Sequence, residues 1–185
     1  PKGPITSLQN TPPTVKQPRA PGGQATDRDR PLPRAAITAL GEAGLLGLVS
    51  ATTVGGMGLG LAEAAQVVER IAEACPSTAM VVTMHYCGTT VLEKFGNEAT
   101  RKDIAAGRHL TTLAWSDTGS GSPFSAPVGS ARQAGNECVL AFSQPLVTSA
   151  GRATSYVGSP LPSPAPGSTT PCHLPRSPAG SRLPH

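Results

Sequence analysis

The chain has 185 residues, of which 38% are hydrophobic, and it carries 15 basic and 11 acidic side chains. Its 20 prolines cluster at the ends, since eight lie in residues 1–34, eight in residues 152–185 and only four between them. Net charge follows the same division, at +4 and +3 in the two end segments and −3 in the middle segment. The basic excess therefore belongs to the ends, and with three Phe, two Tyr and one Trp the composition predicts no nucleic-acid-binding surface.

Four cysteines, Cys75, Cys87, Cys138 and Cys172, show no Cys-x-x-Cys spacing and no nearby run of histidines. This pattern predicts free thiols in a reducing compartment, with neither a zinc site nor a redox pair. No apolar run approaches the roughly 18 residues of a membrane span, and the first residues lack the apolar core of a secretory signal. We therefore expect a soluble, cytoplasmic protein without a metal site or a membrane contact.

Residues 1–33 are rich in Pro, Gly and Gln and have almost no apolar periodicity. A segment that buries few side chains cannot offset the entropy lost on ordering, so we expect a disordered tail. Residues 158–185 are a low-complexity run of Pro, Ser and Gly, and we expect a second disordered tail there. Its composition fits a linker and a shifted reading frame equally well.

A first helix is predicted for residues 36–43, ended by Gly44. A short apolar stretch follows at residues 45–49, and residues 50–60 should be irregular because they are dense in glycine. A second helix is predicted for residues 61–75. Its expected apolar face consists of Leu61, Ala65, Val68, Ile71 or Ala72, and Cys75.

Pro76 should end the second helix, and Ser77 is a good N-cap for a third helix over residues 78–93. This helix is apolar on most sides, so we expect it to be central. His85 lies within it and is predicted to be a core residue with satisfied hydrogen bonds. Asn97 should cap a fourth helix that runs to residue 106 and ends at Gly107.

From residue 110 the pattern is typical of strands, which we predict for residues 110–115, 138–142 and 146–148. Gly135-Asn136 is a turn signal between residues 127–134 and the second of these runs. A block of helices followed by a block of strands predicts an α+β fold. We expect a helical domain at residues 34–109 and a β domain at residues 110–157.

Residues 113–122 join the first predicted strand to a loop of glycines and hydroxyl side chains, reading Leu-Ala-Trp-Ser-Asp-Thr-Gly-Ser-Gly-Ser. A Walker loop would need Lys-Ser or Lys-Thr after Gly121, and a dinucleotide fingerprint would need a third glycine where Phe124 stands. Gly-x-Ser-x-Gly is also missing, which excludes the hydrolase elbow. Two readings remain, an ordinary surface turn and a loop that holds a ligand through main-chain groups and hydroxyls.

Four blocks of sequence resemble those of acyl-CoA dehydrogenases, and they occur in the order of that family. Residues 116–122 are similar to its flavin-binding loop, usually written Thr/Ser-Glu-Pro-x-(Ala/Gly/Ser)-Gly-Ser. Residues 41–58, with Gly41-Glu42-Ala43-Gly44 and Gly55-Gly56-Met57-Gly58, resemble its amino-terminal signature. The third and fourth blocks are Cys75-Pro76-Ser77-Thr78-Ala79 and Val147-Thr148-Ser149-Ala150-Gly151, the latter similar to the second flavin contact.

The resemblance implies an amino-terminal helical domain and a partial, barrel-like β middle domain, without the carboxy-terminal helical domain of the family. It implies an FAD-dependent oxidoreductase that acts on CH–CH bonds of acyl thioesters in fatty acid metabolism. The substrate would be an acyl-CoA or a related small molecule, and full-length relatives would form homo-oligomers. The alternatives are a non-catalytic remnant or interaction module, and a relative of flavin-dependent monooxygenases.

The resemblance also implies a set of site residues. No catalytic residue is assigned, because the family's carboxylate base usually comes from the third domain. Ser122 would approach the substrate as well as the cofactor. The cofactor contacts would be Leu113, Trp115, Ser116, Gly121, Ser122, Leu146, Val147 and Thr148.

Three residues depart from the family pattern near the second flavin contact. Leu146 stands where Trp is expected, which removes an aromatic face, and Pro145 removes an N–H from a predicted strand. Gln144 stands where Lys is frequent. We therefore expect weak binding of FAD. Asp117 replaces a Glu of the loop and is either a structural carboxylate or a solvated acid.

Overall fold

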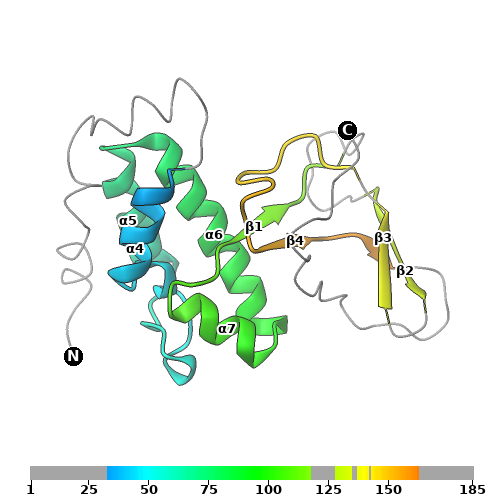
Figure 1. Cartoon of the computed structure of the whole chain (residues 1–185), viewed down its shortest axis with the longest axis horizontal. Coiled ribbons are helices and arrows are strands. Elements are labelled where there is room, and N and C mark those ends of the chain that lie inside the picture. The colour runs from blue at the N-terminus through cyan, green and yellow to red at the C-terminus, as the bar shows by residue number, and fades with distance from the viewer. Residues whose placement is uncertain (1–32, 118–127, 135–136, 142, 163–185) are drawn as a thin grey trace.

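The computed structural model describes residues 33–117, 128–134, 137–141 and 143–162 (Figure 1). Residues 1–32 and 163–185 of the expected tails lie outside the described residues, as do Gly121 and Ser122. The described chain continues past the expected boundary at Val157 to Pro162. The elements are α4 (Arg34–Glu42), η1 (Leu45–Gly47), η2 (Thr52–Val54), α5 (Leu61–Ala72), α6 (Pro76–Phe95), α7 (Glu98–Ala105), β1 (Thr111–Ala114), β2 (Ser130–Ala134), β3 (Glu137–Ala141), β4 (Ser155–Gly158) and β5 (Leu161–Pro162).

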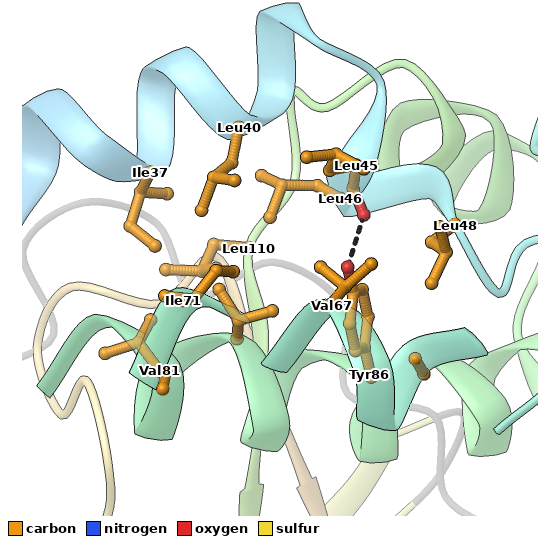
Figure 2. Packing of buried hydrophobic residues seen from close by; sticks show 13 residues of the cluster. Ile37, Leu40, Leu45, Leu46, Leu48, Val67, Ile71, Val81, Tyr86 and Leu110 are labelled. Atoms are coloured by element: carbon orange, nitrogen blue, oxygen red, sulfur yellow. Dashed lines mark hydrogen bonds between the residues drawn. The ribbon is translucent and has the colours of Figure 1, made fainter. Parts of the chain in front are cut away.

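The helices form one half of the molecule and the strands the other, with β1 and β4 between α6 and the hairpin β2–β3 (Figure 1). In the described part, all helices precede β1, which confirms the α+β order. The main apolar core lies between α4, η1, α5 and α6 (Figure 2). Its side chains with no exposed surface include Leu40, Leu45, Leu48, Ile71 and Val82.

Helix α6 is central, as predicted, and it holds η1 through two consecutive side chains. The hydroxyl of Tyr86 donates to the carbonyl of Leu45 at 2.8 Å (Figure 2), and His85 Nε2 lies 2.9 Å from the carbonyl oxygen of Leu46. Carbonyl groups in a short 3₁₀ turn have few partners of their own, so these bonds satisfy buried acceptors.

The predicted apolar face of α5 was right at Ile71, which is buried, and at Val68 and Ala72, which pack against the core, but it was wrong at Leu61 and Ala65. Ala64, Val67 and Ile71 are buried, whereas Leu61 is 66% exposed and Ala65 is exposed. Both stripes are apolar, so periodicity could not choose between them, and packing against α6 decides which is buried.

The predicted start of α6 was also wrong, because the helix begins at Pro76 and not after Ser77. Cys75 is the N-cap, and Pro76 fills the first helical position, where a missing N–H costs nothing. The start of α7 is as predicted, since Asn97 Oδ1 accepts the Thr100 N–H at 2.8 Å. Gly107 follows this helix with a φ of +72°.

The strands form two small sheets. β1 and β4 pair in parallel, with Leu113 opposite Val157, while β2 pairs with β3 in an antiparallel hairpin and with β5 in parallel. The strand predicted for residues 146–148 was wrong, since Leu146 is 79% exposed and turns occupy residues 148–152. The sequence analysis missed β4, which depends on long-range pairing with β1. It also missed β5, which pairs with β2 and lies in residues 158–185, where a disordered tail was expected.

Candidate functional site at the end of strand β1

Strand β1 is held against α6 by close packing and one polar contact. Gly88 allows the close approach, because a Cβ there would lie 2.9 Å from Thr111 Cγ2. The Thr111 N–H donates to His85 Nδ1 at 3.2 Å. The position of the residues that follow β1 is therefore set by a buried helix–strand junction.

Leu113 is the one predicted cofactor contact that lies within β1. Its side chain is half-buried and packs against the second apolar cluster, which contains Leu92, Ile104 and Val157. The side chain of Leu113 thus packs against the core.

Two hydrogen bonds place residues 143–150 beside β1 and the residues that follow it. Thr112 Oγ1 donates to the carbonyl of Thr148 at 2.9 Å, and the side-chain amide of Gln144 donates to Asp117 Oδ1. Because the earlier residue of one segment contacts the later residue of the other, the two segments run antiparallel. We define the candidate site as residues 115–117 together with residues 143–150.

Asp117 is the structural centre of this candidate site. The residue is only 9% exposed, and its Oδ2 accepts the N–H groups of Val128 and Gly129, each at 2.9 Å. Hydrogen bonds to an ionised carboxylate are stronger than neutral ones. Of the two readings of Asp117, the structural carboxylate is therefore the right one, since it joins β1, the start of β2 and Gln144.

The surface of the candidate site mixes apolar and hydroxyl groups. Leu146 is 79% exposed and Val128, beside Asp117 through its N–H group, is 56% exposed. Ser116 is exposed, while Trp115, Val147 and Thr148 are half-buried. Exposed apolar and hydroxyl side chains within one site suit a flat ligand that has polar edges.

Ser149 is a feature that the sequence analysis missed. Its φ of 62° is the single positive value among non-glycine residues of the described chain. Its carbonyl accepts the N–H groups of Arg152 and Ala153, each at 2.9 Å, and its buried Oγ has no hydrogen-bond partner among the described residues. Backbone strain of this kind clusters at functional sites. In the sequence, the short polar side chain of Ser149 was the only sign that a positive φ is possible there.

The two histidines of the described chain serve structural roles. Burial lowers the pKa of His85 from 6.5 to about 4, so the ring is neutral at pH 7, with Nε2–H donating to Leu46 and Nδ1 accepting from Thr111. The prediction that His85 is a core residue is confirmed. His109 Nε2 lies 2.8 Å from Ser155 Oγ, whose own hydroxyl donates to Thr111 Oγ1 at 3.0 Å.

Three further features of the described residues concern metal-binding groups, cysteines and membrane-spanning helices. No group of three His, Cys, Asp or Glu side chains among them could hold a metal ion. Cys75 and Cys87 are free thiols. No helix in the described ranges combines the length and the apolar character that crossing a membrane requires.

Comparison with known proteins places this geometry in a family. A family model described as acyl-CoA dehydrogenase, N-terminal domain, matches residues 14–107, just over half of the chain. The mitochondrial short-chain specific acyl-CoA dehydrogenase of Bos taurus is 27% identical over 138 residues, which cover 71% of this chain and 33% of the relative. The chain therefore spans about a third of the length of that protein.

Solved structures share the fold at low identity. Glutaryl-CoA dehydrogenase from Mycobacterium smegmatis superposes with a TM-score of 0.74 at 18% identity, covering 86% of this chain and 42% of that one. KijD3 in complex with FMN and a dTDP-linked amino sugar gives a TM-score of 0.63 at 21% identity, covering 88% and 40%. The sequence match and the shared fold agree with the four sequence blocks, and the chain belongs to the acyl-CoA dehydrogenase family.

Proposed function

We propose that the chain binds FAD at the candidate site and contributes this surface to the α,β-dehydrogenation of an acyl thioester. One observation carries the proposal. The bonds from Gln144 to Asp117 and from Thr112 to Thr148 bring the two sequence blocks that resemble flavin contacts side by side. Membership of the family and a relative named as an acyl-CoA dehydrogenase support the choice of flavin and of substrate class.

The residues present fit the polar edge and the apolar face of a flavin ring. The exposed Ser116 hydroxyl can donate to a ring acceptor, and Leu146 can lie against the ring plane. Thr148 is fixed beside β1 through its carbonyl group. Gly121 and Ser122, which the resemblance assigns to the pyrophosphate and the thioester chain, complete the proposed contacts. Bound FAD would supply the hydride acceptor.

The reaction also requires a base that removes the α-proton of the thioester, and no described residue fits this role. Asp117 is nearest in sequence to the proposed ring contacts, but its two oxygens already accept three hydrogen bonds. Glu93 pairs with Arg101 at 2.7 Å, and Asp103 pairs with Arg108 at 2.8 Å. We therefore expect little turnover by residues 1–185 alone, since a positioned base contributes about 10²–10⁴-fold to a rate.

Two alternatives keep specific support. The likeness of fold to KijD3, whose structure holds FMN and a sugar nucleotide, favours a flavin protein that acts on a different small molecule. The aliphatic, highly exposed Leu146 and the preceding Pro145 favour an interaction module that has lost its flavin. As in the sequence analysis, an acyl-CoA or a related small molecule is the proposed partner, and homo-oligomers are expected of full-length relatives.

Equilibrium dialysis with FAD and with FMN separates these possibilities. We expect FAD to bind with a Kd in the micromolar range, more tightly than FMN, and Ser116→Ala to weaken it by about fivefold through loss of one hydrogen bond. Thr53→Ala removes an exposed hydroxyl in η2 and should leave the Kd unchanged. Binding of neither flavin would favour the interaction module, and tighter binding of FMN would favour the KijD3-like alternative.

A further inference from the structure

A cleft of about 360 Å³ runs along helix α4. One wall is a single face of that helix, since the lining residues recur at spacings of three and four. The other wall is the connection from α7 to β1 and the residues before β4. The lining residues are Arg34, Ile37, Thr38, Gly41, Glu42, Leu46, Ala106, Gly107, Arg108, Leu110, Arg152 and Thr154.

A main-chain contact joins the two walls of this cleft, and hydrogen bonds hold the two segments of the second wall together. A Cβ on Gly41 would lie 3.0 Å from the carbonyl oxygen of Gly107, so α4 touches the turn after α7 directly. The Thr154 N–H donates to the carbonyl of Leu110 at 2.7 Å, and the Leu110 N–H lies 3.2 Å from Thr154 Oγ1. The cleft is therefore preformed, which lowers the entropic cost of binding a ligand.

Charge is concentrated in the cleft beyond what the composition of the described chain predicts. The described residues include eight basic and nine acidic side chains, yet three of the eight, Arg34, Arg108 and Arg152, line this cleft with a single acid, Glu42. Arg108 pairs with Asp103 at 2.8 Å, while no described carboxylate forms an ion pair with Arg34 or Arg152. Arg34 and Arg152 thus bring positive charge to the cleft without a paired carboxylate among the described residues, and a bound anion would compensate that charge.

We propose that this cleft binds an organic phosphate. Arginine guanidinium groups match the oxygens of a phosphate in a planar, two-pronged geometry. The apolar part of the ligand lies along the floor formed by Ile37, Leu46 and Leu110. The lining of this cleft shares no residue with the proposed flavin contacts.

Amide chemical-shift titration of the 185-residue protein tests this site without any flavin. The probes are inorganic phosphate, phenyl phosphate and adenosine monophosphate. Phenyl phosphate should shift the amides of Thr38, Gly107 and Thr154 saturably, and it should bind at least about threefold more tightly than inorganic phosphate because its ring contacts the floor. Equal affinity for phenyl phosphate and inorganic phosphate would contradict the proposal that the ligand is organic. Tighter binding of adenosine monophosphate than of phenyl phosphate would identify a nucleotide as the source of the phosphate.

Charge variants separate a specific site from general attraction. Arg152→Gln and Arg34→Gln should each weaken phenyl phosphate by about tenfold, and Glu42→Gln should tighten it by about twofold. Arg70→Gln is the matched control, because Arg70 pairs with Glu73 on the exposed surface of α5 and lies outside the cleft. All substituted side chains are exposed, so folding should be retained. Equal losses in the control and the cleft variants, or no saturable shifts at these three amides, would overturn the proposal.

Discussion

The side-chain amide of Gln144 donates to the carboxylate of Asp117, and through this bond two segments 27 residues apart form one surface. The same carboxylate accepts two main-chain N–H groups at the start of β2. Replacing Asp117 by Ala should therefore lower the free energy of unfolding by about 1–3 kcal/mol, because it leaves three donors without an acceptor. Urea unfolding measures this loss, and amide exchange at Val128 and Gly129 should accelerate.

Asp103→Ala is the matched control for this variant. Asp103 pairs with Arg108, whose side chain is 66% exposed, and exposed ion pairs contribute only about 0–1 kcal/mol. A loss for Asp117→Ala no larger than that of the control, with unchanged exchange at the two amides, would show that the carboxylate does not hold the candidate site together.

Leu146→Trp should tighten binding of FAD. The side chain is 79% exposed, so an indole can be accommodated without crowding, and an aromatic contact contributes about 0.5–1.5 kcal/mol beyond area burial. This corresponds to a Kd lower by about 2–10-fold in equilibrium dialysis. Leu61→Trp places the same indole at an exposed site on α5 and should not change the Kd. An equal gain in both variants would point to nonspecific stacking.

The buried His85 makes stability depend on pH. Its pKa is about 4 in the folded chain and 6.5 when unfolded, because burial disfavours the charged ring and the nearby His109 adds to this effect. Above pH 6.5 the ring is neutral in both the folded and the unfolded state, so His85 adds no pH dependence there. As the pH falls from 6.5 towards 4, the unfolded state takes up a proton that the folded state does not, and the free energy of unfolding falls by about 2 kcal/mol at pH 5.

Urea unfolding at pH 7 and pH 5 of the native chain and of His85→Gln measures this contribution. The variant should be less stable than the native chain at pH 7. Between pH 7 and pH 5, however, its free energy of unfolding should fall by about 2 kcal/mol less than that of the native chain. Carboxylates titrate in both proteins and cancel in the difference. The same loss in both proteins would mean that His85 is protonated in the folded state.

Gly107→Ala should destabilise the chain more than Gly55→Ala does. Both glycines have positive φ values, +72° and +92°, so both variants bear the cost of about 1–2 kcal/mol for a left-handed side chain. Only at Gly107 would the new Cβ meet main-chain atoms, at 2.7 Å from Gly41 Cα, whereas nothing lies within 4 Å at Gly55. The difference in unfolding free energy should exceed about 1 kcal/mol, and equal losses would contradict the direct contact of α4 with the turn after α7.

Local signals predicted the parts of the fold that depend on a few neighbouring residues. Asn97 and Gly107 mark the two ends of α7, and the spacing of Ile37 and Leu40 marks α4. Strand β4 was not predicted because its sequence, Ser-Tyr-Val-Gly, has little apolar alternation. The strand is fixed by pairing with β1, whose residues lie 44 positions earlier in the chain. Long-range pairing of this kind leaves no local pattern.

In the candidate site, too, some features could be predicted from the sequence and others could not. The resemblance selected the two segments, but the sequence could not show that Leu113 points into the core or that Asp117 reaches the start of β2. It also could not show the strained φ of Ser149, because serine occurs freely in ordinary turns. The first two depend on contacts between segments distant in sequence.

Fluorescence of Trp115 tests the central claim most directly, because it is the single Trp of the chain and lies within the candidate site. A flavin bound there would absorb the tryptophan emission at close range. We predict saturable quenching by FAD with the Kd found by dialysis, and the same titration after Asp117→Ala should need several-fold more FAD. Binding of FAD by dialysis without quenching of Trp115 would place the flavin elsewhere and contradict the account.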